Sequence, residues 1–244
     1  MTGPAPAWRL SPWGIVVLAS AVLVIGATVA LLVATVASSR ERIVRFAVKG
    51  EVTGVMLDLG DADVVIAGGG SRQVLEVQRT DRFAFSHDAD VRRTVIAGAV
   101  SIHSRCPTTV PRSCSARYRL VVPDNVPVDV RTDAGTVRLR GYRGSMRVTT
   151  RSGDIDIAAF CGFSLQAGTE GGDIDAGVAC APQRLSLRST DGNVRAQVPP
   201  GRYQVEAESA SGSERVSGVA SAADAPYSIQ ALSSSGDVAV EGRP

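Results

Sequence analysis

The 244-residue sequence is poor in the residue types that most often carry catalysis and metal binding. It contains only two histidines, His87 and His103, and neither has the spacing to a second ligand or to a nucleophile that a zinc site or a catalytic triad needs. Aromatic residues make up 5% of the chain, so the platforms on which sugar-cleaving enzymes and lectins stack their ligands are scarce. The sequence therefore predicts no catalytic residues, no cofactor and no enzymatic activity.

The charge balance argues against a nucleic-acid partner. The chain has 26 basic and 24 acidic residues, a formal net charge of +2, and Lys49 is its only lysine. Nucleic-acid binding requires basic residues gathered on one face. The arginines here are scattered among acids, so we expect no nucleic-acid partner.

No charged residue lies between Leu10 and Ser39, and residues 14–37 are mostly apolar. As a helix this stretch is about 36 Å long, enough to span a bilayer with some tilt. Trp8 and Trp13 stand where interfacial aromatics are common, and Arg9 and Arg40 bracket the ends of the apolar stretch. We predict a transmembrane helix over 14–37, with the lipid bilayer as its partner, after a short segment 1–13. A cleaved signal peptide ending near Ala37 is the alternative, although its apolar core would be only about 7–15 residues.

A twelve-residue pattern recurs through the second half of the chain: two alternating apolar residues, a serine or threonine, a glycine three residues later, and two more alternating apolar residues. The corner glycines are Gly135, Gly153, Gly172, Gly192, Gly212 and Gly236, and the hydroxyl residues are Thr132, Thr150, Thr169, Ser189, Ser209 and Ser233. The apolar period of two is typical of strands with one buried face, and a repeat of about 20 residues is typical of solenoids. Each unit is therefore predicted to be strand, corner, strand, with the hydroxyl supporting the backbone at the bend. Glu214 occupies an inward position, so the fifth coil is expected to be distorted.

The predicted fold class is all-β: a parallel β-helix or β-solenoid of six to seven coils with a short antiparallel leading segment, preceded by one transmembrane helix. Residues 55–66 fit as a degenerate first coil, in which Ala62 replaces glycine and Leu59 replaces the hydroxyl residue. The expected divisions are a juxtamembrane linker over 38–51, the leading β segment over 52–125 and the regular repeats over 126–244. Short strands between the first coil and the repeats are expected to form hairpins that cover one end of the stack.

The four cysteines help to predict on which side of the membrane the C-terminal domain lies. Cys161 and Cys180 each lie eight residues after a corner glycine, so stacking places them about 5 Å apart, and Cys106 and Cys114 flank a short loop. Disulfides Cys161–Cys180 and Cys106–Cys114 would indicate an oxidising, extracytoplasmic compartment, although buried free thiols are the alternative. Arg40, Arg42, Arg45 and Lys49 follow the helix and would, by the positive-inside rule, favour a cytoplasmic domain instead. We expect a single-pass protein of the cytoplasmic membrane whose C-terminal domain lies outside the cytoplasm.

Four aspartates form the one candidate metal site. Stacking places Asp154 beside Asp173 and Asp156 beside Asp175, where the carboxylates could share a calcium ion or could simply be solvated. The same polar row could instead contact a partner at the cell envelope or cell surface.

The repeated segments Thr-Arg-Ser-Gly-Asp-Ile-Asp-Ile, Ser-Thr-Asp-Gly-Asn-Val and Ser-Ser-Ser-Gly-Asp-Val resemble the bacterial DUF4097 family of adhesin-like β-strand repeats, over about residues 52–242. The resemblance implies a parallel stack, often attached to a membrane segment, and supplies no catalytic residues. The function expected is non-catalytic binding or a structural role in the cell envelope. Self-association into a scaffold through the uncapped last coil, and a calcium module, are the alternatives.

Overall fold

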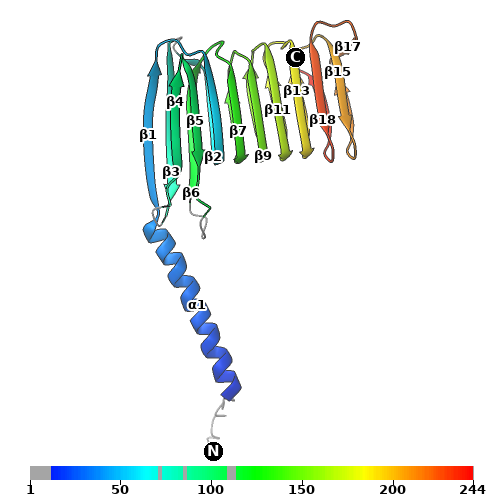
Figure 1. The fold of residues 1–244 in the computed structure, drawn as a ribbon. Coiled ribbons are helices and arrows are strands. Elements are labelled where there is room, and N and C mark those ends of the chain that lie inside the picture. The colour runs from blue at the N-terminus through cyan, green and yellow to red at the C-terminus, as the bar shows by residue number, and fades with distance from the viewer. Residues whose placement is uncertain (1–11, 71–72, 85–86, 109–113, 244) are drawn as a thin grey trace, which may run out of the picture.

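The structure, a computed structural model, describes residues 12–70, 73–84, 87–108 and 114–243. Helix α1 (Pro12–Ser38) extends away from one end of a row of strands (Figure 1). Its segment Val16–Val33 has a mean hydropathy of 2.8, so by length and composition it could cross a membrane. Trp8 and Arg9, which we expected near a membrane interface, lie outside the described residues.

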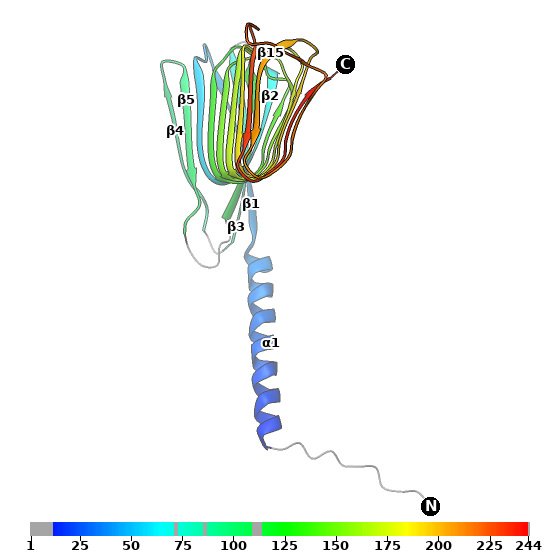
Figure 2. The ribbon, with the colours of Figure 1, turned by 90° about the vertical axis from the view of Figure 1, so that its right-hand side faces the viewer.

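The strands are β1 (Arg40–Lys49), β2 (Gly54–Gly70), β3 (Val74–Phe83), β4 (Asp90–Ile96), β5 (Ala99–Arg105), β6 (Cys114–Pro123), β7 (Val128–Ala134), β8 (Val137–Arg140), β9 (Met146–Ser152), β10 (Ile155–Phe160), β11 (Ser164–Gly171), β12 (Ile174–Val178), β13 (Arg184–Asp191), β14 (Val194–Val198), β15 (Arg202–Ser209), β16 (Glu214–Ser217), β17 (Ala220–Ser221), β18 (Ser228–Ser233) and β19 (Val238–Gly242). Most of them form two facing sheets that meet along one edge, giving a U-shaped cross-section (Figure 2). Sheet A contains β1, β3, β6, the second half of β2, β8, β10, β12, β14, β19 and β16. Sheet B contains β4, β5, the first half of β2, β7, β9, β11, β13, β18 and β15.

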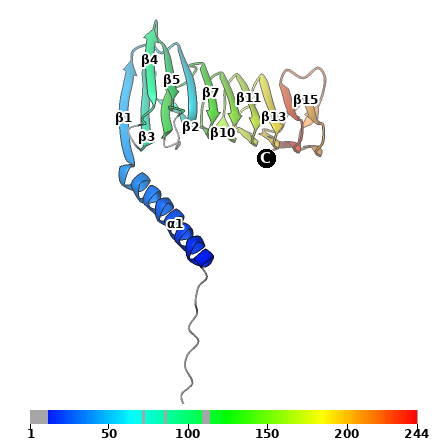
Figure 3. The same ribbon diagram turned by 60° about the horizontal axis from the view of Figure 1, so that its bottom comes forward.

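The core lies between the two sheets because alternate residues point inward in register. Val137, Ile155, Ile174, Val194 and Val238 form one such column, and all are buried. A buried side chain of this size stabilises the fold by about 1.5–3 kcal/mol. Coils therefore stabilise one another through the same inward positions, as the repeat predicts, and the row of coils is visible from the side in Figure 3.

Each corner is held by its glycine and its hydroxyl. A Cβ atom on Gly153, Gly172 or Gly192 would overlap the backbone carbonyl of the corner residue in the adjacent coil, so the column excludes side chains. The hydroxyls of Thr169, Ser189, Ser233 and Ser209 donate to the carbonyls of Gly153, Gly172, Gly192 and Gly236, at 3.2, 2.9, 2.7 and 2.7 Å. The predicted role of the hydroxyl as a backbone support is confirmed.

The leading segment differs in part from the prediction. Residues 55–66 do form the first coil, with Leu59 beside Thr132 as expected. However, β5 and β6 pair parallel with the other side of β2 and form a further layer of the solenoid rather than a hairpin cover. Antiparallel pairing begins beyond that layer, where β4 joins β5 and β3 joins β6. The sequence pattern did not reveal this layer because the β5–β6 corner lacks the corner glycine and contains the longer connection between Cys106 and Cys114.

Residues 40–49, expected to be part of a linker, form β1, which pairs antiparallel with β3 along its whole length. Val44, Phe46 and Val48 alternate and are half-buried on the inward side, which explains why the segment is a strand. The Arg93 guanidinium lies 4.4 Å from the ring centroid of Phe46, and Arg42 pairs with Asp88 at 3.0 Å. These contacts join β1 to the β4 side and close the first end of the stack.

The order of the last two coils is the main topological correction. The sequence suggested that coils stack in chain order, so that coil 228–242 would end the solenoid. Instead β18 lies between β13 and β15, and β19 lies between β14 and β16. The final coil is inserted, and coil 202–217 is the outer one. The predicted distortion of that coil follows, because Glu214 and Val216 face an open end, where Val216 is 46% exposed.

Candidate binding surface

The two histidines lie in different elements of the described chain. His103 in β5 contacts Asp58 in β2, with its Nδ1 2.9 Å from Oδ2, and Arg105 donates to the other carboxylate oxygen at 2.6 Å. His87 lies in the connection between β3 and β4. Across the described residues, no three or more histidine, cysteine, aspartate or glutamate side chains are grouped as a metal site would require.

Asp154 and Asp173 lie side by side, as predicted, but their oxygens support backbone. Oδ1 of Asp154 accepts the Asp173 N–H at 3.0 Å, and Oδ1 of Asp173 accepts the Asn193 N–H at 2.7 Å. The series continues from Asn193 to Asp237 and from Asp237 to Ser213, in the spatial order of the coils. A small polar residue directly after the corner residue is the sequence signal for this ladder, which the repeat analysis missed.

Asp156 and Asp175 are also neighbours, on the outer face of sheet A. Asp156 forms an ion pair with Arg140 at 2.7 Å, and Asp175 is exposed between Asp156 and Arg195. The four aspartates thus divide into a corner pair that binds backbone and an outer pair in a row of mixed charge. This arrangement serves the stacking of coils and offers exposed carboxylates on one face.

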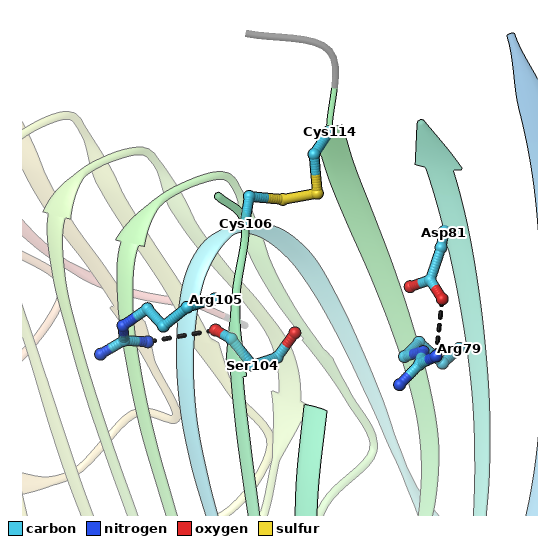
Figure 4. The surroundings of a disulfide bond; sticks show 6 residues. All are labelled: Arg79, Asp81, Ser104, Arg105, Cys106 and Cys114. Atoms are coloured by element: carbon cyan, nitrogen blue, oxygen red, sulfur yellow. Dashed lines mark hydrogen bonds and ion pairs between the residues drawn. A yellow bond between two sulfur atoms is a disulfide. The ribbon is translucent and has the colours of Figure 1, made fainter. Parts of the chain in front are cut away.

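The cysteines pair as the register predicted. Cys161 and Cys180 form a disulfide with a Cα–Cα distance of 4.7 Å, and Cys106 and Cys114 form a second one at 5.7 Å. The first joins adjacent coils, and the second closes the corner of the β5–β6 layer (Figure 4). Each disulfide cross-links the backbone at a position away from the corner glycines.

A buried ion pair lies close to the second disulfide. Arg79 and Asp81 in β3 point inward, with Nη2 2.6 Å from Oδ2, and Asp81 is 1% exposed (Figure 4). Tyr118 in β6 is beside Arg79 in the register, and burial is the main cause that raises its pKa. The sequence signal for this pair is a carboxylate at an inward position of a strand whose residues alternate between buried and exposed. It lies in β3, outside the repeats. A buried pair costs desolvation, so the presence of this ion pair does not by itself indicate added stability at this end of the stack.

A large hollow of the described surface lies on sheet B, away from the aspartates. This trough, of about 940 Å³, crosses the outer faces of β9, β11, β13, β18 and β15 and is also lined by residues 221–223. Arg147, Arg184 and Arg188 line it together with Glu206. A second hollow of about 410 Å³, over β2, β5, β7 and β9, shares Arg147 and Gln166 with the trough.

Amide and hydroxyl groups form the floor of the trough. Arg147 Nε donates to Gln166 Oε1 at 3.0 Å, Ser186 Oγ donates to Gln230 Oε1 at 3.1 Å, and Gln230 Nε2 donates to Glu206 at 2.8 Å. The backbone beneath is fixed by parallel ladders on both sides of β9, β11, β13 and β18. The floor is therefore a fixed polar surface, suited to hydrogen bonding along the stack.

These features define a class: a disulfide-braced parallel β-solenoid preceded by an apolar helix. Residues 125–241 match the family model described as Toastrack DUF4097. None of the curated proteins matches the chain.

Two solved structures resemble the chain at low sequence identity. A candidate cell adhesion protein from Clostridium sporogenes is 10% identical with a TM-score of 0.48, over 84% of this chain and 100% of that one. A candidate adhesin from Bacteroides fragilis is 12% identical with a TM-score of 0.47, over 83% of this chain and 97% of that one.

Proposed function

We propose that the chain is a single-pass membrane protein that displays a non-catalytic binding module outside the cytoplasmic membrane, and that the sheet B trough contacts a component of the cell envelope. The observation that carries the proposal is the trough itself: a polar hollow across five strands on a rigid, cross-linked stack. Pockets that bind ligands combine a concave shape with a few fixed polar groups. The Gln166–Ser186–Gln230 floor supplies such groups.

The two disulfides favour an extracytoplasmic domain, because cytosolic thiols are kept reduced. The basic residues after the helix, which argued for the opposite orientation, belong to β1, and two of them have partners in the fold: Arg42 pairs with Asp88 and Arg45 contacts Gln78. Their presence has a structural cause, which weakens them as a topology signal. The length of α1, 27 residues, supports an uncleaved anchor over a signal peptide.

Location is tested on the full chain in intact cells with a membrane-impermeant thiol reagent, with and without reductant. We expect labelling only after reduction, from outside the cell, and a full-length mass that retains residues 14–37. Labelling that requires permeabilised cells and no reductant would place the domain in the cytoplasm and overturn the proposal.

Binding is tested by sedimenting isolated cell envelopes with the full chain in nanodiscs, beside a Ser186→Trp variant. Ser186 is half-buried in the floor of the trough, so an indole there fills the hollow without entering the core. We expect the variant to sediment much less than the wild type. The control is Ala239→Trp, at a half-buried outward position on sheet A, which should sediment normally. Equal sedimentation of both variants with the wild type would exclude the trough.

Self-association is the second candidate function. It is favoured by coil 202–217, where β16 pairs only with β19 and β15 pairs on its outer side only at Arg202 and Tyr203, within the described residues. Unpaired strand edges can join a second chain. Light scattering of the full chain in nanodiscs at rising concentration distinguishes the two: growth without limit supports a scaffold, and a constant mass supports display.

A further inference from the structure

We propose, on the basis of the function above, that the ligand of the sheet B trough is an extended, hydroxyl-rich polymer carrying carboxylate or phosphate groups. The first reason is charge. Three arginines and one glutamate line the trough, a formal balance of +2. The glutamate, Glu206, already accepts from Gln230 at 2.8 Å.

Two of the arginines lack a carboxylate partner. Many arginines of the stack are paired, as Arg140 is with Asp156 and Arg195 with Glu241, each at 2.7 Å. In the described chain Arg184 and Arg188 form no ion pair, and both are exposed. A guanidinium can bind a carboxylate or a phosphate through two parallel hydrogen bonds, so these groups fit an anion of either kind.

The spacing of the arginines favours a chain over a small anion. Arg184 and Arg188 are four residues apart on one face of β13, a separation of about 13 Å at the rise of a strand. Arg147 lies on β9, two strands away across β11, or about 10 Å. One phosphate or carboxylate cannot reach all three. Gly168, between Thr149 and Arg188 in the register, leaves a lining position on β11 without a side chain.

The remaining lining indicates a ligand with hydroxyl groups. Gln166, Ser186 and Gln230 provide donors and acceptors along the floor. The lining contains no aromatic residue, so stacking on sugar faces does not contribute and charge with hydrogen bonding must supply recognition. The trough extends over five strands, about 19 Å between the outermost two, which is longer than one or two sugar units.

The test measures binding of three defined polymers to the full chain in zwitterionic nanodiscs: polygalacturonate oligomers, poly(glycerol phosphate) and uncharged dextran. We expect one or both anionic polymers to bind, more weakly as salt rises, and dextran not to bind. The double variant Arg184→Gln/Arg188→Gln should weaken binding about tenfold or more, as expected when two charged hydrogen-bonding groups are lost. The relative affinity of the two anionic polymers identifies carboxylate or phosphate as the preferred group.

The matched control is Arg138→Gln/Arg215→Gln, which removes the same charge from the outer face of sheet A. It should change affinity less than twofold. An equal loss in both double variants would mean non-specific attraction and overturn the inference, as would unchanged binding in the trough variant. If the wild type sediments with envelopes but binds none of the polymers, the ligand class is wrong and the binding function stands. If it binds neither, both proposals fail.

Discussion

At the scale of single residues, the corner glycine Gly172 differs from Gly168, another glycine of the same repeat. Gly172 has a φ of 147°, and a Cβ there would overlap the Gly153 carbonyl of the adjacent coil. At Gly168, on the outer face of β11, the nearest atom to an added Cβ is the Arg188 carbonyl oxygen at 3.8 Å. Identical substitutions at the two positions therefore separate backbone crowding from the general effect of replacing glycine.

We expect Gly172→Ala to lower the free energy of unfolding by about 2–4 kcal/mol, because backbone atoms must move to accept the methyl group. Gly168→Ala should change it by less than about 1 kcal/mol. Denaturant unfolding of both variants, followed by circular dichroism, provides the measurement. Equal losses would show that the corner tolerates a side chain.

The hydroxyl column contains one exception. Thr150 is 1% exposed and its Oγ1 has no hydrogen-bond partner in the described chain, whereas the Thr169 hydroxyl donates to Gly153. Thr150→Val should therefore be neutral or stabilising, since it removes an unsatisfied buried polar atom. Thr169→Val, one coil away, should cost about 1 kcal/mol by leaving the carbonyl without its donor. Melting temperatures of the two variants test this, and a Thr150 variant that melts as low as the Thr169 variant would contradict it.

Asp58 gives the fold an acid sensitivity on sheet B. Burial alone would raise the pKa of Asp58, but hydrogen bonds from Arg105 and His103, with their charges, hold it below its usual value. A lowered folded pKa means that the unfolded chain binds the proton first, so this stabilisation is complete above about pH 5 and is lost as pH falls through the folded pKa. The melting temperature of Asp58→Asn should fall less than that of the wild type between about pH 6 and pH 3. Asp175→Asn, at an exposed position without an ion pair in the described chain, should follow the wild type.

At the scale of elements, the insertion of the final coil can be tested by cross-linking. Ser186 and Gln230 are register partners, and Gln230 is in turn the partner of Glu206, so Ser186 and Glu206 lie two strands apart. Ser186→Cys/Gln230→Cys should oxidise to a disulfide that peptide mapping detects. Ser186→Cys/Glu206→Cys should not, because about 10 Å exceeds the reach of a disulfide. The opposite result would restore stacking in chain order.

The coils themselves could be predicted from the sequence, but their order in the stack could not. Inward alternation and the corner column fixed the coils, their parallel register and the Cys161–Cys180 bridge, because all of these depend on positions within one unit. The order of coils depends on which units share an edge, and coils with nearly equal apolar columns do not specify their neighbours. Glu214 was the one clue, since a charge in the inward column fits an outer coil better than an inner one. The trough was not predictable either, because its lining comes from five neighbouring strands and from residues 221–223, and which strands are neighbours depends on the order of the coils.

At the scale of the whole molecule, the two ends of the stack are closed differently. The first end has antiparallel strands, the β1–β4 contacts and the Arg79–Asp81 pair. The second end is coil 202–217, whose inward column holds Glu214 where the neighbouring coil has Val238. Glu214 Oε1 accepts the Ser209 N–H at 2.7 Å, so the carboxylate is held across the open end. An inward-pointing charge on an edge strand is a device that blocks pairing with another chain.

Glu214→Val would restore the apolar column and remove the charge, so we expect the full chain in nanodiscs to associate through coil 202–217 as its concentration rises. Glu208→Val is the matched control, because it removes the same charge and adds the same side chain at an exposed outward position of β15, in the same coil. Light scattering should show an increasing mass for the first variant and a constant mass for the second. A constant mass for both would show that pairing is blocked by something other than Glu214, and association of the wild type itself would make the scaffold the better account of this protein.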